Sequence, residues 1–183
     1  MTANAFLAID LTDGERHALS AALAAASPGT PIPGRRQQPE NWHITLRFLG
    51  ELDSVALERV AHDVEGALDA QEGKVVCARL GAFPGPSRAA VVYCAVVDHA
   101  GLLATLAAQC DAAAIDAGLE PEGRPFVPHL TLSRVRPPVD VRRLLESFDD
   151  FSVPVDVREV ALMRSDTSRG RLRYETLERF PLS

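Results

Sequence analysis

His43-Ile44-Thr45-Leu46 and His129-Leu130-Thr131-Leu132 are two copies of one four-residue pattern. Chance placement of Thr and Leu behind two of the five histidines has a probability on the order of a few in ten thousand. One copy would carry little information, whereas two copies are a strong signal. We therefore expect the two segments to be related elements of the fold.

Each copy of this pattern is typical of a β-strand, in which alternate side chains face opposite sides. The histidine and the threonine of a copy then share one face, and its two aliphatic residues point into the core. If the two polar faces meet across a cleft, that cleft holds two imidazoles and two hydroxyls.

The sequence around the two copies predicts strands and helices in a repeated order. We expect strands over residues 6–11, 42–49, 74–83, 89–97, 129–132, 153–163 and 172–177, and helices over 12–25, 53–70, 99–117 and 139–148. Pro137-Pro138 is expected to end the strand that begins at His129. This order predicts an α+β fold with two antiparallel-sheet lobes, outer helices and a central cleft that carries both His-x-Thr strands.

The length and composition favour one globular unit. A chain of 183 residues fits one compact domain, so we expect a single bilobal domain over residues 1–183 and a monomer. The N-terminus lacks a basic signal sequence, and no apolar run approaches the ~18 residues that a membrane span needs. We therefore expect a cytoplasmic location and no membrane partner.

The net charge of −6 argues against non-specific coating of nucleic acid, which requires excess Lys and Arg. Residues 164–173 nevertheless hold four arginines, opposed only by Asp166. This segment indicates either a small phosphate-attracting turn around Ser168-Arg169-Gly170 or an ordinary solvated hairpin.

Two imidazoles and two hydroxyls suit the hydrolysis of a phosphodiester. An imidazole titrates near ~6.5, so one histidine can accept a proton from water while the other donates one to the departing sugar oxygen. The hydroxyls can donate to the non-bridging oxygens. This scheme requires no metal or cofactor, and the residues alone leave open which histidine is the donor.

The two histidines allow two other interpretations. Both could be structural, but the duplication of the pattern favours function. A zinc site is disfavoured because no third ligand accompanies the pair at ligand spacing. His17, His62 and His99 lack the motif context and are assigned to helix surfaces or helix ends.

The sequence resembles the 2H phosphoesterase superfamily, and within it the RNA 2′,3′-cyclic phosphodiesterases, also called 2′-5′ RNA ligases. The resemblance spans nearly the whole chain. It is carried by the segments Phe6-Leu-Ala-Ile-Asp-Leu11, Trp42-His-Ile-Thr-Leu-Arg-Phe-Leu-Gly50, Pro125-Phe-Val-Pro-His-Leu-Thr-Leu132 and Tyr174-Glu-Thr-Leu-Glu-Arg-Phe-Pro-Leu182.

The resemblance implies a pseudo-twofold axis between the two His-x-Thr strands and hydrolysis of a 2′,3′-cyclic RNA end to a 2′-phosphomonoester. It implies that His43 donates the proton to the leaving 3′ oxygen and that His129 accepts the proton of water. Thr45, Thr131 and Arg134 would bind the phosphate. The partner would be RNA with a cyclic phosphate end or a small cyclic nucleotide.

Some positions near the motifs stay open at this point. Strict alternation from His129 turns Arg134 away from the cleft unless the strand bulges. Arg47 lies on the histidine side by the same alternation and is a secondary candidate. Val127 stands where relatives often carry a basic residue. Phe48, Phe126 and Tyr174 can stack on a base, but core positions are expected for them.

Two other functions remain for the same residues. The first is action on a different cyclic nucleotide or on a 2′-5′ linked oligonucleotide, or ligation in reverse. The second is a non-catalytic module that binds RNA ends. Turnover by the purified protein separates that module from an enzyme.

Overall fold

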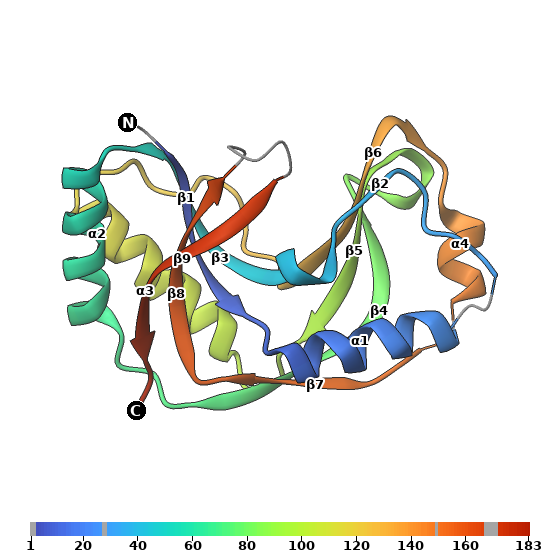
Figure 1. Cartoon of the computed structure of the whole chain (residues 1–183), viewed down its shortest axis with the longest axis horizontal. Helices are drawn as coiled ribbons and strands as arrows, with labels where there is room; N and C mark the ends of the chain where they lie inside the picture. Colours follow the sequence, from blue (N-terminus) through green and yellow to red (C-terminus); the bar gives the residue numbers. More distant parts are fainter. Residues whose placement is uncertain (1–2, 27–28, 149, 167–171) are drawn as a thin grey trace.

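The computed structural model describes residues 3–26, 29–148, 150–166 and 172–183, in which nine strands form one curled antiparallel sheet with four α-helices (Figure 1). The strands are β1 (Ala3–Asp10), β2 (Arg35–Arg36), β3 (His43–Leu52), β4 (Gly73–Phe83), β5 (Ala89–Val97), β6 (His129–Val139), β7 (Val153–Val157), β8 (Glu159–Asp166) and β9 (Arg173–Pro181). The helices are α1 (Asp13–Ala26), α2 (Ser54–Ala67), α3 (Leu102–Asp116) and α4 (Arg142–Ser147), with 3₁₀ turns η1 (Pro39–Asn41) and η2 (Pro86–Arg88).

The sheet consists of two halves with matching topology. The strand order is β7-β4-β5-β6-β3-β1-β8-β9, and β2 adds to β6. The halves meet where β3 and β6 pair through Ile44 and Leu130. The predicted α+β fold with two related antiparallel halves is confirmed, with the difference that the halves share one sheet.

Each half receives a helix from the other half. Helix α1 follows β1 but contacts β7, and the Glu15 carboxylate accepts a hydrogen bond from the Asp156 amide (2.7 Å). Helix α3 follows β5 but packs against β3 and α2. Figure 1 shows α1 along one half and α2 and α3 on the other. These exchanged helices tie the two halves together.

The aliphatic residues of both motifs lie in the core. Ile44 and Leu130 are fully buried, and Leu46 and Leu132 are nearly so. Each such side chain contributes about 1.5–3 kcal/mol by leaving water. Burial therefore fixes the register of β3 and β6, since a shift by one residue would expose these side chains.

Both motif strands contain a bulge one residue after the threonine. The β1–β3 register shifts between Leu7 and Ala8, and the β5–β6 register shifts between Val92 and Tyr93. A bulge adds one residue and reverses the alternation beyond it. The residue five positions after each histidine, Phe48 or Arg134, is therefore exposed between buried neighbours.

The predicted strand over residues 153–163 is wrong in its continuity. It consists of β7, which pairs with β4, and β8, which pairs with β1, so its two parts serve different halves of the sheet. The strand is interrupted at Arg158, whose carbonyl accepts a hydrogen bond from the Leu182 amide (2.8 Å). Alternation within each part gave no signal of the break.

The prediction that Pro137-Pro138 ends strand β6 is wrong. The strand continues to Val139, which pairs with Ala89 beyond a register irregularity at which β6 carries extra residues relative to β5. At such an irregularity the ladder does not require an N–H group, so proline is tolerated.

The predicted basic turn at residues 168–170 lies outside the described residues. Among the described helices, none is long and apolar enough to cross a membrane.

Candidate active site

Four side chains of the duplicated motif converge on one face of the sheet. Ile44 pairs with Leu130, and both point into the core. Extended by one residue in each direction, this register sets each histidine across from the threonine of the other strand. We call this surface the histidine face, defined by His43, Thr45, His129 and Thr131.

The two histidines use the same hydrogen bond to fix their tautomer. Nδ1 of His43 lies 2.8 Å from the Asn41 carbonyl, and Nδ1 of His129 lies 2.8 Å from the Val127 carbonyl. A carbonyl oxygen only accepts, so Nδ1 carries the proton in both rings. Each Nε2 is left for chemistry at the histidine face.

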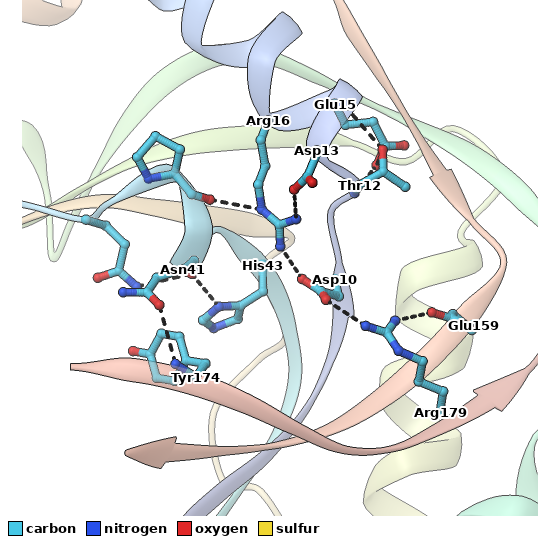
Figure 2. Close-up of polar contacts among 12 residues, drawn as sticks. Asp10, Thr12, Asp13, Glu15, Arg16, Asn41, His43, Glu159, Tyr174 and Arg179 are labelled. Atoms are coloured by element: carbon cyan, nitrogen blue, oxygen red, sulfur yellow. Dashed lines mark hydrogen bonds and ion pairs between the residues drawn. The ribbon is translucent and has the colours of Figure 1, made fainter. Parts of the chain in front are cut away.

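Aromatic rings enclose His43. The Phe6 ring stacks on the imidazole at 4.7 Å, and the Tyr174 ring meets it edge-on at 4.8 Å. The Asn41 side chain accepts from the Tyr174 amide (3.3 Å) and donates to the Leu172 carbonyl (3.0 Å), as Figure 2 shows in part. Asn41 therefore holds both the imidazole and the start of β9.

Asp10 ends β1 and pairs in register with His43. Its carboxylate binds Arg16 (2.6 Å) and Arg179 (3.1 Å), which approach from α1 and β9 (Figure 2). The Arg16 Nε group also donates to the Pro39 carbonyl (3.0 Å), just before β3. This network fixes the carboxylate beside the histidine strand.

Burial lowers the pKa of His43 from its usual value to about 4. The Asn41 carbonyl and the Asp10 carboxylate oppose this change, while His129 and Arg134 add to it. Because desolvation penalises the charged imidazolium, the ring is neutral at neutral pH in the free protein.

His129 lies in a similar but more open aromatic setting. Phe83 and Tyr93 approach its ring edge-on at 5.0 and 5.4 Å. Burial lowers its pKa, the Val127 carbonyl raises it, and the charge of Arg134 lowers it further. Both imidazoles are therefore available as neutral bases in the free protein.

Arg134 lies on the histidine face because of the bulge in β6. Its side chain is exposed, whereas Ser133 and Val135 on either side of it are buried. Its positive charge lowers the pKa of His43 and of His129. Strict alternation from His129 would have turned it away.

Arg47 is not a candidate for substrate binding, so this secondary expectation is wrong. The bulge in β3 turns it inward, where only 7% of the residue is exposed. Its guanidinium pairs with Asp111 (2.7 Å) and Glu122 (3.9 Å) and donates to the Glu120 carbonyl. Arg47 therefore anchors the loop that leads into β6.

The expected core position of Phe48 is wrong, because 47% of this residue is exposed. The bulge that buries Arg47 places this ring on the histidine face, 6.3 Å from Phe6. Phe126 packs partly buried against the core, and Tyr174 is half-buried beside His43. These two rings are thus nearer to the expected core positions than Phe48 is.

The other histidines lie on helices or at a helix end, as predicted. Nδ1 of His17 bonds the Asp13 carbonyl within α1 (2.7 Å), His62 is exposed on α2, and His99 is exposed before α3. The cysteines are free and buried, and burial raises the pKa of Cys110 to about 12. Within the described ranges, no group of three metal-ligating side chains comes together.

Asp10 and Asn41 are the supporting residues that sequence reasoning missed. Asp10 closes the quoted segment that begins at Phe6, and Asn41 directly precedes Trp42-His43. Both lie in or beside the segments that carry the family resemblance. Only the pairing of Asp10 with His43 and the hydrogen bond from His43 to the Asn41 carbonyl show their supporting role. A polar residue at the end of an apolar strand was the available signal.

Comparison with known proteins identifies the family of this chain. The 2′-5′ RNA ligase superfamily matches residues 33–169. An RNA 2′,3′-cyclic phosphodiesterase of Methanothermobacter thermautotrophicus is 32% identical over all of both chains, and one of Aeropyrum pernix is 31% identical over 81% of this chain and 86% of its own. The crystal structure of Escherichia coli LigT with 3′-AMP superposes with a TM-score of 0.77 at 27% identity, covering 100% of this chain and 99% of LigT. The chain therefore belongs to the 2′-5′ RNA ligase superfamily of 2H phosphoesterases.

Proposed function

We propose that the protein hydrolyses 2′,3′-cyclic phosphodiester ends of RNA to 2′-phosphomonoesters, with one histidine from each half of the sheet. The observation that carries this proposal is the histidine face, where both Nδ1 atoms are engaged by backbone carbonyls. The relatives named RNA 2′,3′-cyclic phosphodiesterase support the choice of substrate.

The proposed reaction needs one proton acceptor and one proton donor. Nε2 of neutral His129 takes a proton from water, whose oxygen attacks phosphorus. The bond from phosphorus to the 3′ oxygen breaks, and Nε2–H of protonated His43 supplies the proton to that oxygen. One proton is taken and one is given, so the site returns to its starting charge with the protons exchanged between the rings.

The phosphate is held by neutral and charged donors. The hydroxyls of Thr45 and Thr131 donate to the non-bridging oxygens, and Arg134 opposes the negative charge that builds in the transition state. Arg134 is exposed between buried neighbours, and its charge lowers the pKa of His43, which supports this role. No metal or cofactor takes part in this scheme.

His43 must gain a proton to act as donor, although burial lowers its pKa to about 4. A bound phosphate anion places negative charge beside the ring and favours the imidazolium, as Asp10 already does. We therefore expect substrate and proton to bind together at His43, and kcat/KM to be highest on the acid side of the usual histidine pKa of about 6.5.

The exposed Phe48 ring is the proposed platform for the terminal base. It shares the histidine face and occupies the position of the β3 half that matches Arg134 in the β6 half. Base stacking on an aromatic ring is sequence-tolerant.

A single domain over residues 1–183, a monomeric state and a cytoplasmic location stay predictions. The continuous sheet and the shared core support the single domain.

The test is incubation of the purified protein, in excess EDTA, with an oligoribonucleotide that ends in a 2′,3′-cyclic phosphate. We expect a 2′-phosphomonoester, identified by mass and by phosphatase treatment. A 3′-phosphomonoester would reverse the assignment of the leaving oxygen. Binding without turnover by a folded protein would favour a module that binds RNA ends. Turnover only of other cyclic nucleotides or of 2′-5′ linkages would replace the proposed substrate with one of these.

A further inference from the structure

Strand β2 places one arginine on the histidine face. It pairs with β6 so that Arg35 lies opposite Arg134 and Arg36 lies opposite Ser133. Directly opposite residues of an antiparallel pair have side chains on the same face. Arg35 therefore shares the exposed face of Arg134, whereas Arg36 shares the face of the buried Ser133.

The surroundings of Arg36 confirm that the two neighbouring arginines face opposite ways. Arg36 lines a surface hollow beside α1, together with Leu23 and Trp42. Leu23 and Trp42 belong to the main hydrophobic core, so the hollow lies against the core side of the sheet. Arg35 and Arg36 are thus a matched pair of exposed cations, of which only Arg35 is on the histidine face.

The backbone of β2 is held firmly against β6. Gly34 has a φ of +84°, and a Cβ atom on it would lie 2.5 Å from the Arg134 carbonyl oxygen, so the close approach requires glycine. Two residues beyond Arg35, the Gln37 amide donates to the Leu132 carbonyl (2.7 Å). The position of Arg35 is therefore set by the backbone.

The pairing of Arg35 with Arg134 puts like charges side by side, which is unfavourable in the absence of an anion. No carboxylate of the described residues lies within ion-pair distance of either guanidinium. Arg136, two residues farther along β6, is exposed and likewise has no ion-pair partner in the described part of the chain. In a chain of net charge −6, this group of cations is suited to an anionic ligand.

Arg35 reaches the histidine face from β2, across from Arg134, which lies five residues along β6 from His129. The face continues outward along β6 from His129 through Arg134 to Arg136. An RNA chain whose cyclic end lies between the histidines must leave the site somewhere, and this side offers positive charge.

We propose that Arg35 binds the phosphodiester next to the terminal nucleotide, so that the site selects the end of an RNA chain over a free 2′,3′-cyclic mononucleotide. This inference rests on the proposed function. The terminal phosphate is held by the motif residues and Arg134, and Arg35 adds a contact that a mononucleotide cannot use. A charge-assisted contact of this kind discriminates by about 10- to 100-fold.

The test compares kcat/KM for a 2′,3′-cyclic mononucleotide and for a dinucleotide with the same cyclic end. Wild type is expected to favour the dinucleotide by about 10- to 100-fold. Arg35→Gln is expected to remove most of that preference and to change the mononucleotide value by no more than about threefold. Arg36→Gln, the matched control on the opposite face, is expected to keep the preference. The thermal unfolding of each variant is measured to check folding.

A binding measurement separates failure of this inference from failure of the proposed function. Fluorescence anisotropy with an oligoribonucleotide that ends in a 2′-phosphate is expected to show weaker binding by Arg35→Gln than by Arg36→Gln. The slope of log K against log salt should fall by about 0.7, the value for one single-strand phosphate contact. No turnover of either substrate by wild type would refute the proposed function alone. Equal losses on both substrates, or unchanged binding by Arg35→Gln, would overturn the role of Arg35.

Discussion

The two halves of the sheet share a scaffold but differ in the side chains at matching positions. The residue in register with the histidine is Asp10 in one half and Ala95 in the other. Five positions after the histidine, one half has Phe48 and the other has Arg134, each brought to the face by the same bulge. The backbone is duplicated, and the chemistry is divided between the halves.

This difference assigns separate tasks to the halves. The β3 half encloses its histidine between Phe6 and Tyr174, places a carboxylate near it, and offers an aromatic ring outside. The β6 half leaves its histidine more open and offers positive charge. A symmetric site would hold both ends of a substrate alike, whereas the proposed site has a base side at Phe48 and a phosphate side at Arg134.

The largest expected effect comes from removing either imidazole. His43→Ala and His129→Ala should each lower kcat/KM by about 10² to 10⁴, because each removes one of the two proton transfers. Steady-state hydrolysis of an RNA cyclic phosphate end measures the loss. His62→Ala, an exposed histidine on α2, serves as the control and should retain wild-type activity. Near-normal activity of either motif variant would contradict the mechanism.

The phosphate side comes next in size. Arg134→Gln should lower kcat/KM by about 10²-fold, because a charged donor to the transition-state oxygens is lost. The measurement is the rate with saturating and with low substrate, and the loss should appear in kcat as well as in KM. A change confined to KM would make Arg134 an ordinary binding residue.

The base side should depend on the base itself. Phe48→Ala should reduce kcat/KM by about 5- to 160-fold on ordinary cyclic ends, because stacking contributes about 1–3 kcal/mol per base. With an oligonucleotide whose terminal nucleotide lacks a base, the variant and wild type should be equal. The comparison fails if the abasic substrate loses as much activity as the normal one.

These side-chain contrasts mark where the sequence was informative and where it was not. Alternation in the motifs placed His43, Thr45 and the aliphatic residues correctly, because burial of Ile44 and Leu130 dictates the face. The bulges could not be seen, since they depend on pairing with β1 and β5. For that reason Arg47 was expected to face the site and Phe48 was expected in the core.

The two-residue strand β2 was also not predicted. Residues 31–38 read as a Pro- and Gly-rich loop, and neither periodicity nor composition showed that Arg35 would pair with β6. The break between β7 and β8 was missed for a similar reason, because it depends on which half each strand joins. Local pattern predicted the elements, whereas partner choice needed the three-dimensional fold.

The smallest effect concerns the carboxylate beside His43. Asp10 raises the pKa of this ring, so Asp10→Asn should lower that pKa further below its wild-type value. Because His43 must be protonated to donate, the alkaline limb of kcat/KM should move to lower pH. Titration of the imidazole by NMR measures the pKa directly. Asp13→Asn, at a largely exposed partner of Arg16, should leave it unchanged, and a rise in the Asp10→Asn pKa would contradict the account.

The central claim is that one histidine from each half forms a single catalytic unit. Its most direct test is the activity of the His43→Ala/His129→Ala double variant against the two single variants, on one RNA cyclic phosphate end in EDTA. Residues that act as a unit are strongly non-additive, so the double variant should be about as slow as the slower single variant. Losses that multiply would show that the two histidines act independently, and would contradict the account.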